Sequence, residues 1–336
     1  MYQQEVLDND SILIYKFLDW ICVDKINWSN LSRNPCAIQV LEENQNRLNW
    51  SDLSLNINAI KLLEENQDKI NWFHLSLNIN AIHVLEENQE KINWSGLSFN
   101  PNAAIHLFEK NQNKIDWYHF SEHINLNSNR NSKRNSIVIQ LLEKNQDKIS
   151  WFHLSRNPNA IQLLEKNLDK VSWVNLSLNP NAIHLLEKNL DKVSWVNLSS
   201  NPNAIQLLEK NQDKIDWWAL SSNPNAIHLL EKNIDKIYWW ALSLNPNAIH
   251  LLENNLDKVW WNSLSSNPNA IHLLENNQDK ISWENLSFNE SIFSKTINYK
   301  FLKNRMDVIR EELVVKCMHP DRLVRWLENG GDIDDF

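Results

Sequence analysis

Histidines recur at one position of a repeated segment, and a ladder of imidazoles can bind metal ions or respond to pH. They are His184, His228, His250 and His272, each directly after an Ala-Ile pair. Other copies carry Gln or Lys there, at Gln39, Lys61, Gln140, Gln162 and Gln206. The ligands of one ion lie about 2 Å from it, closer than neighbouring copies approach each other. We therefore predict a solvated face, with no metal site and no cofactor.

Carboxylates paired with lysines recur in the same segment, and two carboxylates can act as a general acid and a general base. One copy holds Glu187, Lys188, Asp191 and Lys192. A catalytic pair occurs once, in a pocket, whereas these pairs occur in nearly every copy. The chain also has only three glycines, too few for phosphate-binding loops or nucleophile elbows. We predict solubilising charges and no enzymatic activity.

Aromatic side chains offer a binding surface instead. The position after each repeated Trp accepts Ser, Asn or Glu in several copies, so we expect it to be exposed. Aromatic residues stand there at Tyr118, Phe152, Trp218 and Trp240, and Trp260 comes close to this position in the next copy. Exposed aromatic patches mark interaction sites. We predict a protein-binding patch, the alternative being that these side chains pack against a neighbouring turn.

Charge and composition exclude other partners. The chain has 33 basic and 42 acidic residues, a net charge of −9, and its one basic cluster is Arg130, Lys133 and Arg134. An extended nucleic-acid surface needs an excess of positive charge. No apolar run approaches the roughly 18 residues of a membrane span, and the N-terminus lacks a secretory signal. The three cysteines lack disulfide or zinc spacing. We expect no nucleic acid, no membrane and a cytoplasmic, non-secreted protein.

A 22-residue repeat must position these side chains. Its Trp recurs at Trp28, Trp50, Trp72, Trp94, Trp117, Trp151, Trp173, Trp195, Trp217, Trp239, Trp261 and Trp283. One extra Ala precedes Trp117, and a polar insertion within residues 122–136 precedes Trp151. We expect that insertion to be a surface loop.

The pattern of each copy predicts two short helices. Asn179-Pro180 is a helix start signal and Ile183 and Leu186 share one helix face, which predicts a helix from Pro180 to Lys188. A shorter helix or 3₁₀ turn should run from Trp173 to the following Leu-Ser pair. The repeated Trp is expected in the core.

The predicted fold is an all-α, elongated solenoid of about twelve 22-residue repeats, a curved rod on the order of 100 Å long. The repeats should occupy residues 28–289, with helical caps at 1–27 and 290–336. A helix opening at Asp10-Ser11 should form the first cap. A leucine-rich-repeat-like horseshoe is the alternative, although it would bury Arg33 and Arg156 in a strand ladder.

The Leu-Ser-x-Asn-Pro core followed by a short apolar helix is similar to leucine-rich-variant repeats, which alternate an α-helix with a 3₁₀ helix. The repeated Trp departs from that family. Asn-Pro-Asn-Ala-Ile-His-Leu-Leu-Glu-Lys-Asn and Asp-Lys-Ile-x-Trp resemble repeat proteins of giant amoeba-infecting, mimivirus-like DNA viruses. The tail resembles theirs at Ile309–Leu313, His319–Arg322 and Leu327–Ile333. The resemblance implies a viral source and a host-cell cytoplasmic location, and no activity.

Two functions follow from this reading. The first is a non-enzymatic scaffold or adaptor that binds a host or viral protein along a repeat surface. The alternative is a self-associating structural protein of a virus particle or inclusion.

Overall fold

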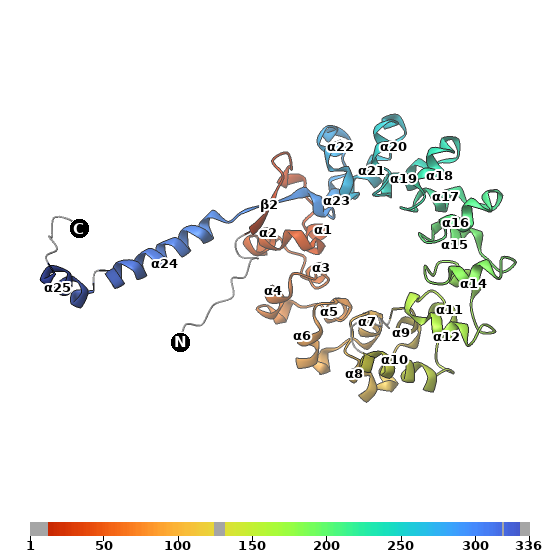
Figure 1. The fold of residues 1–336 in the computed structure, drawn as a ribbon, viewed down its shortest axis with the longest axis horizontal. Coiled ribbons are helices and arrows are strands. Elements are labelled where there is room, and N and C mark those ends of the chain that lie inside the picture. Colours follow the sequence, from red (N-terminus) through yellow and green to blue (C-terminus); the bar gives the residue numbers. More distant parts are fainter. Residues whose placement is uncertain (1–12, 124–131, 318, 330–336) are drawn as a thin grey trace. The chain divides into compact units, whose positions relative to one another are not determined.

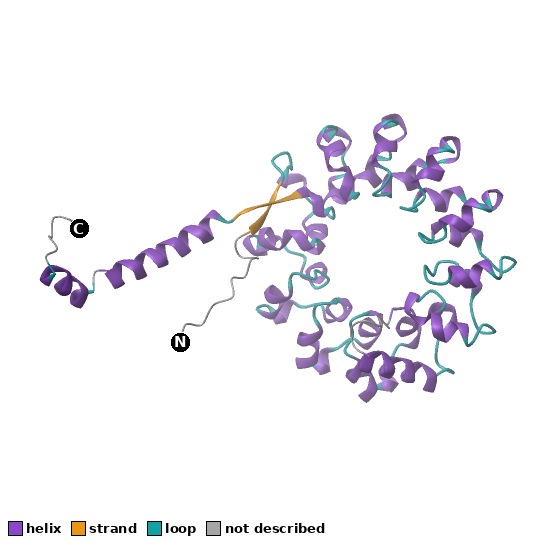
Figure 2. Ribbon diagram, in the orientation of Figure 1, coloured by secondary structure: helices purple, strands orange, loops and turns teal. Residues whose placement is uncertain are grey.

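The computed structural model describes residues 13–123, 132–317 and 319–329 (Figure 1). The chain divides into a repeat unit, Asp19–Ile292, and a terminal unit made of Met1–Leu18 and Phe293–Phe336. Helices dominate both units (Figure 2). Each unit is described by itself.

Every repeat begins with a short helix that starts at the repeated Trp, here called a Trp helix. These are α1 (Trp28–Arg33), α3 (Trp50–Leu53), α5 (Trp72–Leu77), α7 (Trp94–Phe99), α9 (Trp117–His123), α11 (Trp151–Leu154), α13 (Trp173–Leu176), α15 (Trp195–Ser200), α17 (Trp217–Ser221), α19 (Trp239–Leu244), α21 (Trp261–Ser265) and α23 (Trp283–Leu286). The short Trp helix predicted from the sequence is confirmed.

A second helix, here called the outer helix, follows in eleven repeats. These are α2 (Ile38–Glu43), α4 (Ile60–Glu64), α6 (Ile82–Glu87), α8 (Ile105–Lys110), α10 (Ser132–Lys144), α12 (Ile161–Glu165), α14 (Ile183–Glu187), α16 (Ile205–Glu209), α18 (Ile227–Glu231), α20 (Ile249–Glu253) and α22 (Ile271–Glu275). In most repeats a 3₁₀ turn such as Gln212–Lys214 then leads to the next Trp.

The predicted helix from Pro180 to Lys188 is too long, because α14 begins only at Ile183. The Asn179 side chain accepts a hydrogen bond from the backbone N–H of Asn181 at 3.0 Å. This local bond holds the Asn-Pro-Asn segment in a turn and competes with helix formation. In three repeats the same segment forms a 3₁₀ turn, at Pro35–Ala37, Pro158–Ala160 and Pro268–Ala270.

The repeats form two layers around one core. Figure 1 shows the Trp helices along the inner side of the repeat unit and the outer helices along its outer side. Leu176 from the first layer and Leu186 from the second are fully buried, as are their equivalents in other repeats. Neighbouring Trp helices also contact each other. The all-α solenoid is therefore confirmed. The leucine-rich horseshoe is wrong, because that fold needs a strand at Leu176 to Leu178, where Leu176 ends a helix and Ser177 and Leu178 form a turn.

The solenoid closes on itself. Asn27, before the first Trp helix, donates its backbone N–H to Oγ of Ser287, in the last repeat, at 2.9 Å. Asn49 makes the equivalent bond to Ser32 at 3.1 Å between the first two repeats. The repeat unit is thus a closed ring of twelve repeats, hereafter the ring (Figure 1).

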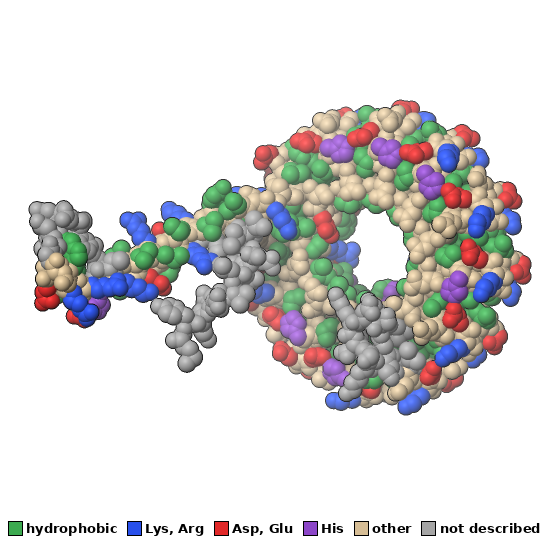
Figure 3. Space-filling model, in the orientation of Figure 1, with side chains coloured by type: hydrophobic (Ala, Val, Ile, Leu, Met, Phe, Trp, Pro, Cys, Tyr) green, Lys and Arg blue, Asp and Glu red, His purple; other side chains and the backbone are tan. Residues whose placement is uncertain are grey.

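Closure overturns the expectation of an elongated rod with two capped ends. An open array leaves one face of its first and last repeats uncovered, and caps would be needed to cover them. Here the first and last repeats cover each other. In Figure 3 an opening passes through the centre of the ring, and charged side chains gather mainly on the outer side.

In its described residues, the terminal unit holds two strands and two helices. Strand β1 (Leu13–Phe17) pairs antiparallel with β2 (Phe293–Ile297), with Phe17 opposite Phe293. The two rings of this pair stack at 4.6 Å. We predicted a helix that opens at Asp10-Ser11 and runs through Leu13 and Phe17. This prediction is wrong from Leu13 on, because the backbone there forms its hydrogen bonds with the neighbouring strand. Residues 10–12 lie outside the described part.

Two helices follow β2, namely α24 (Tyr299–Cys317) and α25 (Pro320–Glu328). The predicted helices of the C-terminal segment are therefore present, preceded by a strand. Gly330 to Ile333 of the predicted tail motif lies outside the described residues. The predicted loop at 122–136 is described only at its edges, and the prediction is wrong there because both edges are helical: His123 ends α9 and Ser132 begins α10. Arg130 lies outside the described part.

Candidate protein-binding surface

The Trp helices expose the side opposite to their core contacts. Leu and Ser three and four residues after the Trp are buried, whereas the first and fifth positions after it are largely exposed. Figure 1 places the Trp helices along the inner side of the ring, so these exposed side chains belong to its inner layer. Apolar side chains occupy it in most successive repeats, and we call them the inner stripe: Phe73, Phe99, Tyr118, Phe152, Val174, Val196, Trp218, Trp240, Leu244 and Phe288.

Trp218 and Trp240 form the largest aromatic pair of this stripe. Their ring centroids lie 6.4 Å apart and their planes differ by 4°. The pair is parallel because both residues hold the same position in consecutive, nearly identical helices. They are 49% and 43% exposed, so their faces remain available to a partner.

A shallow depression borders this pair. It has a volume of about 470 Å³ and is lined by residues that include Trp218, Asp235, Lys236 and Tyr238. Tyr238 is 54% exposed and was missed by the sequence analysis. It stands before a repeat Trp, where most copies carry Asn, Asp or Ser. An aromatic residue at a helix N-cap was the signal that could have identified it.

Trp260 holds the position of Tyr238 one repeat later and is 55% exposed. It makes no ring contact with Trp218 or Trp240. The predicted patch is therefore a stacked pair with Tyr238 beside it, and Trp260 stands one repeat further along.

Tyr118 and Phe152 belong to a separate cluster. The Tyr118 ring lies 3.6 Å from that of His153, and the Phe152 ring lies 5.0 Å from it. They come from α9 and α11, whereas Trp218 and Trp240 come from α17 and α19. The five predicted residues thus divide between two arcs of the ring.

Histidines give the second cluster a distinct electrostatic character. Burial lowers the pKa of His123, Glu122 opposes this shift, and the neighbouring His119, Arg156 and His153 add to it. Burial likewise lowers the pKa of His153. Nδ1 of His119 is buried and has no hydrogen-bond partner among the described residues. The lowered pKa values of His123 and His153 favour their neutral imidazoles.

Glu122 is the acidic member of this cluster. Its Oε1 lies 3.3 Å from Nη1 of Arg156 and 3.9 Å from Nε2 of His123. This pairing offsets part of the cost of placing ionisable groups close together.

The recurrent histidines lie on the outer helices, where each contacts a Glu of the preceding repeat. Nε2 of His184 lies 2.7 Å from Oε1 of Glu165, and His228 has the same relation to Glu209. Both histidines are exposed. Within the described ranges, no group of three or more His, Cys, Asp and Glu residues is placed to hold a metal ion.

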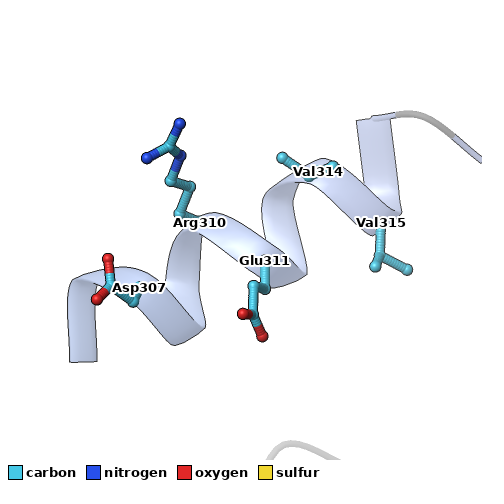
Figure 4. Close-up of a pocket in the computed structure, with 5 residues that line it drawn as sticks. All are labelled: Asp307, Arg310, Glu311, Val314 and Val315. Atoms are coloured by element: carbon cyan, nitrogen blue, oxygen red, sulfur yellow. The ribbon is translucent and has the colours of Figure 1, made fainter. Parts of the chain in front are cut away.

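A hollow beside α24 involves one helix only. Asp307, Arg310, Glu311, Val314 and Val315 border it, and Figure 4 shows Arg310 and Val314 on one side of the helix and Glu311 and Val315 on another. Among the described residues, all five that border this hollow belong to α24.

Among the described residues, no helix combines the length and the apolar character required to cross a lipid bilayer. No family model, curated protein or solved structure matches the chain.

Proposed function

We propose that the protein is a non-enzymatic interaction scaffold whose ring binds a segment of another protein on the inner stripe. The observation that carries this proposal is the parallel, half-exposed pair of Trp218 and Trp240. Tryptophan is among the residues that contribute most to binding when a partner covers it.

The rest of the stripe supports an elongated partner segment. Val174, Val196, Trp218 and Trp240 follow one another in four consecutive repeats, each about half exposed. An extended or helical segment with regularly spaced apolar side chains would contact several repeats at once.

The resemblance to giant-virus repeat proteins supports a proposal about the source of the protein itself. We propose a viral protein that acts in the cytoplasm of the host cell and binds a host or viral protein. The residue patterns quoted above support this proposal.

Affinity capture from host-cell lysate tests the scaffold function, followed by titration of the captured partner in purified form. The test variant is Trp218→Ser with Trp240→Ser. The control variant is Leu190→Ser with Leu256→Ser, which removes exposed apolar side chains (36% and 40%) from the turns after the outer helices.

We expect the Trp variant to bind the purified partner at least 100-fold more weakly, because two large anchors would be lost. The Leu variant should bind within about threefold of the unmodified protein, since surface substitutions away from an interface change little. Equal affinities of the two variants would refute the Trp pair as the binding site. Failure of the unmodified protein to capture any partner would refute the scaffold function.

A further inference from the structure

Two positions of neighbouring repeats contact each other in the inner layer. They are the residue after a repeat Trp and the residue before the next repeat Trp. Their side chains share a hydrogen bond in three joints, Ser29–Asn49, Ser51–Asn71 and Ser95–Asp116. Both positions are aromatic in only two joints, Trp218–Tyr238 and Trp240–Trp260. Exposed aromatic side chains therefore replace a polar contact in these two joints.

The joint of Trp218 and Tyr238 borders the depression of about 470 Å³, which Asp216 and Asp235 also line. The backbone N–H of Ala219 donates a hydrogen bond to Oδ1 of Asp216 at 2.8 Å, and Asp235 is exposed. Within the described part of the chain, neither carboxylate forms an ion pair. Two unpaired carboxylates thus lie beside two half-exposed aromatic side chains.

Lys236 lines the depression as well, but its cation contacts a different ring. Its Nζ lies 4.6 Å from the ring centre of Trp217, and the equivalent residues of other repeats make the same contact. In the described ranges, no Lys or Arg lies over the ring of Trp218 or Tyr238. The two carboxylates outnumber this single lysine, so the depression keeps an excess of negative charge.

Aromatic faces beside carboxylates favour an organic cation. A cation within about 6 Å of an aromatic ring centre is attracted by the negative face of the ring. A carboxylate adds a charge-assisted hydrogen bond. The guanidinium of arginine can make both contacts, because it is planar, stacks on aromatic rings and carries several N–H donors. The ammonium of lysine fits less well, since it is compact and more strongly hydrated.

We propose that the depression between Trp218 and Tyr238 is an arginine-binding site, which receives one arginine side chain of the partner segment. The guanidinium stacks on an aromatic ring and donates hydrogen bonds to Asp235. This inference rests on the proposed function, because it names the chemistry of a segment that binds on the inner stripe.

A library of random peptides displayed on phage, selected against the full chain, tests the proposal. We expect the enriched peptides to carry an arginine among apolar residues. Titration calorimetry then measures the affinity of a synthetic peptide with an enriched sequence. Replacement of its arginine by glutamine should weaken binding by about tenfold or more, because the cation is lost. Replacement by lysine should weaken binding by about threefold or more.

Two variants of Tyr238 separate a cation contact from a hydrophobic contact. Tyr238→Leu keeps an apolar side chain but removes the aromatic face, and should weaken binding of the peptide by about fivefold. Tyr238→Phe keeps the aromatic face and should bind within about twofold of the unmodified protein.

Asp235→Asn removes one carboxylate and should weaken binding of the peptide by about fivefold. Asp191→Asn is the matched control, since Asp191 is the exposed equivalent of Asp235 two repeats earlier. The joint beside it carries Val174 and Ser194 in place of the aromatic pair. This control should leave binding unchanged. Circular dichroism of all variants verifies that the ring stays folded.

Four results would overturn the proposal. Enriched peptides without arginine that fail to bind the variant Trp218→Ser with Trp240→Ser would leave the scaffold function standing and exclude the arginine site. Equal affinities of Tyr238→Leu and Tyr238→Phe would exclude a cation–π contact. Tighter binding after trimethyl-lysine replaces the arginine would assign the depression to a methylammonium group. If no enriched peptide depends on Trp218, both the arginine site and the inner stripe as a binding surface are excluded.

Discussion

The side-chain Nδ2 of Asn34 donates a hydrogen bond to the backbone carbonyl oxygen of Asn289 at 3.1 Å, across a sequence separation of 255 residues. It also donates to the carbonyl of Ser287 at 3.3 Å. Within the ring, Asn201 makes the same two bonds to Ser177 and Asn179, at 3.0 Å each. The joint between last and first repeats is thus built like an internal joint.

This equivalence predicts equal energetic consequences. Asn34→Ala and Asn201→Ala should each lower the free energy of unfolding by about 3 kcal/mol, because each leaves buried backbone carbonyls without a donor. Urea denaturation measures both. A nearly neutral Asn34→Ala beside a costly Asn201→Ala would show that the ring is open in solution.

Asn203→Ala is a suitable control for both variants. Its Nδ2 also bridges two repeats, by donating to the carbonyl of Pro180 at 3.0 Å, but Asn203 is exposed. Water can replace the lost donor there, so we expect a loss of less than about 1 kcal/mol.

A cation covers each repeat Trp. Nζ of Lys214 lies 4.9 Å from the ring centre of Trp195, and all twelve repeat tryptophans have such a contact, the last from Lys25 to Trp283. Lys214→Met should therefore lower the free energy of unfolding, measured by urea denaturation, by about 0.5–1 kcal/mol. Lys210→Met, at an exposed position without such a contact, should be neutral. Equal effects of the two variants would contradict a cation–π contribution.

Lowering the pH should destabilise the ring through His123 and His153. Their pKa values are lowered in the folded protein, so the unfolded chain binds protons first as the pH falls. This contribution to stability is complete above the unfolded pKa of about 6.5 and is lost as the pH falls below it. Denaturation between pH 7.5 and 5.5 should show this loss, and it should be smaller for His123→Asn with His153→Gln. An unaltered pH dependence in that variant would exclude these two residues as its origin.

A substitution on the proposed binding surface should destabilise the protein less than a substitution in the core. Trp218→Ser removes a half-exposed side chain and one stacking contact, which should cost about 1 kcal/mol. Leu220→Ala, two residues later, empties a fully buried site and should cost about 3 kcal/mol. Thermal unfolding compares the two. A large loss for Trp218→Ser would mean that this residue serves packing.

The repeat pattern predicted the two helical segments well because local signals specify them. Leu176 and Leu186 mark core positions, and Asn or Ser before the Trp marks a helix start. The repeat Trp itself was expected in the core but is only half-buried, and a cation at the end of the same repeat, such as Lys192 for Trp173, covers its ring.

Closure could not be predicted, since it depends on the small rotation between neighbouring repeats, which no single residue encodes. The inter-repeat role of the buried Asn was also missed. Asn179 was expected only to start a helix, yet it bridges to Ser155 and Asn157 as well. In the repeat beside the insertion, His123 occupies the position equivalent to Asn179. Its partial burial follows from this position, at which other repeats carry a buried Asn.

For the candidate site, the sequence correctly placed Trp218 and Trp240 at exposed positions because Ser and Asn occupy equivalent sites. The sequence alone could not separate Tyr118 and Phe152 from this pair, because that separation depends on how far apart their repeats lie around the ring. The parallel stacking and the contribution of Tyr238 likewise depend on how consecutive helices are oriented.

Closure also constrains how the coding sequence can evolve. Tandem copies are readily gained or lost by unequal recombination, and an open solenoid tolerates such changes because each repeat touches only its neighbours. Twelve repeats in a circle turn by about 30° each, and eleven would need about 33° at every joint. A change of one whole copy would therefore strain all joints together or break the joint between Asn34 and Asn289. The closed ring therefore constrains the number of copies as well as the residues within each copy.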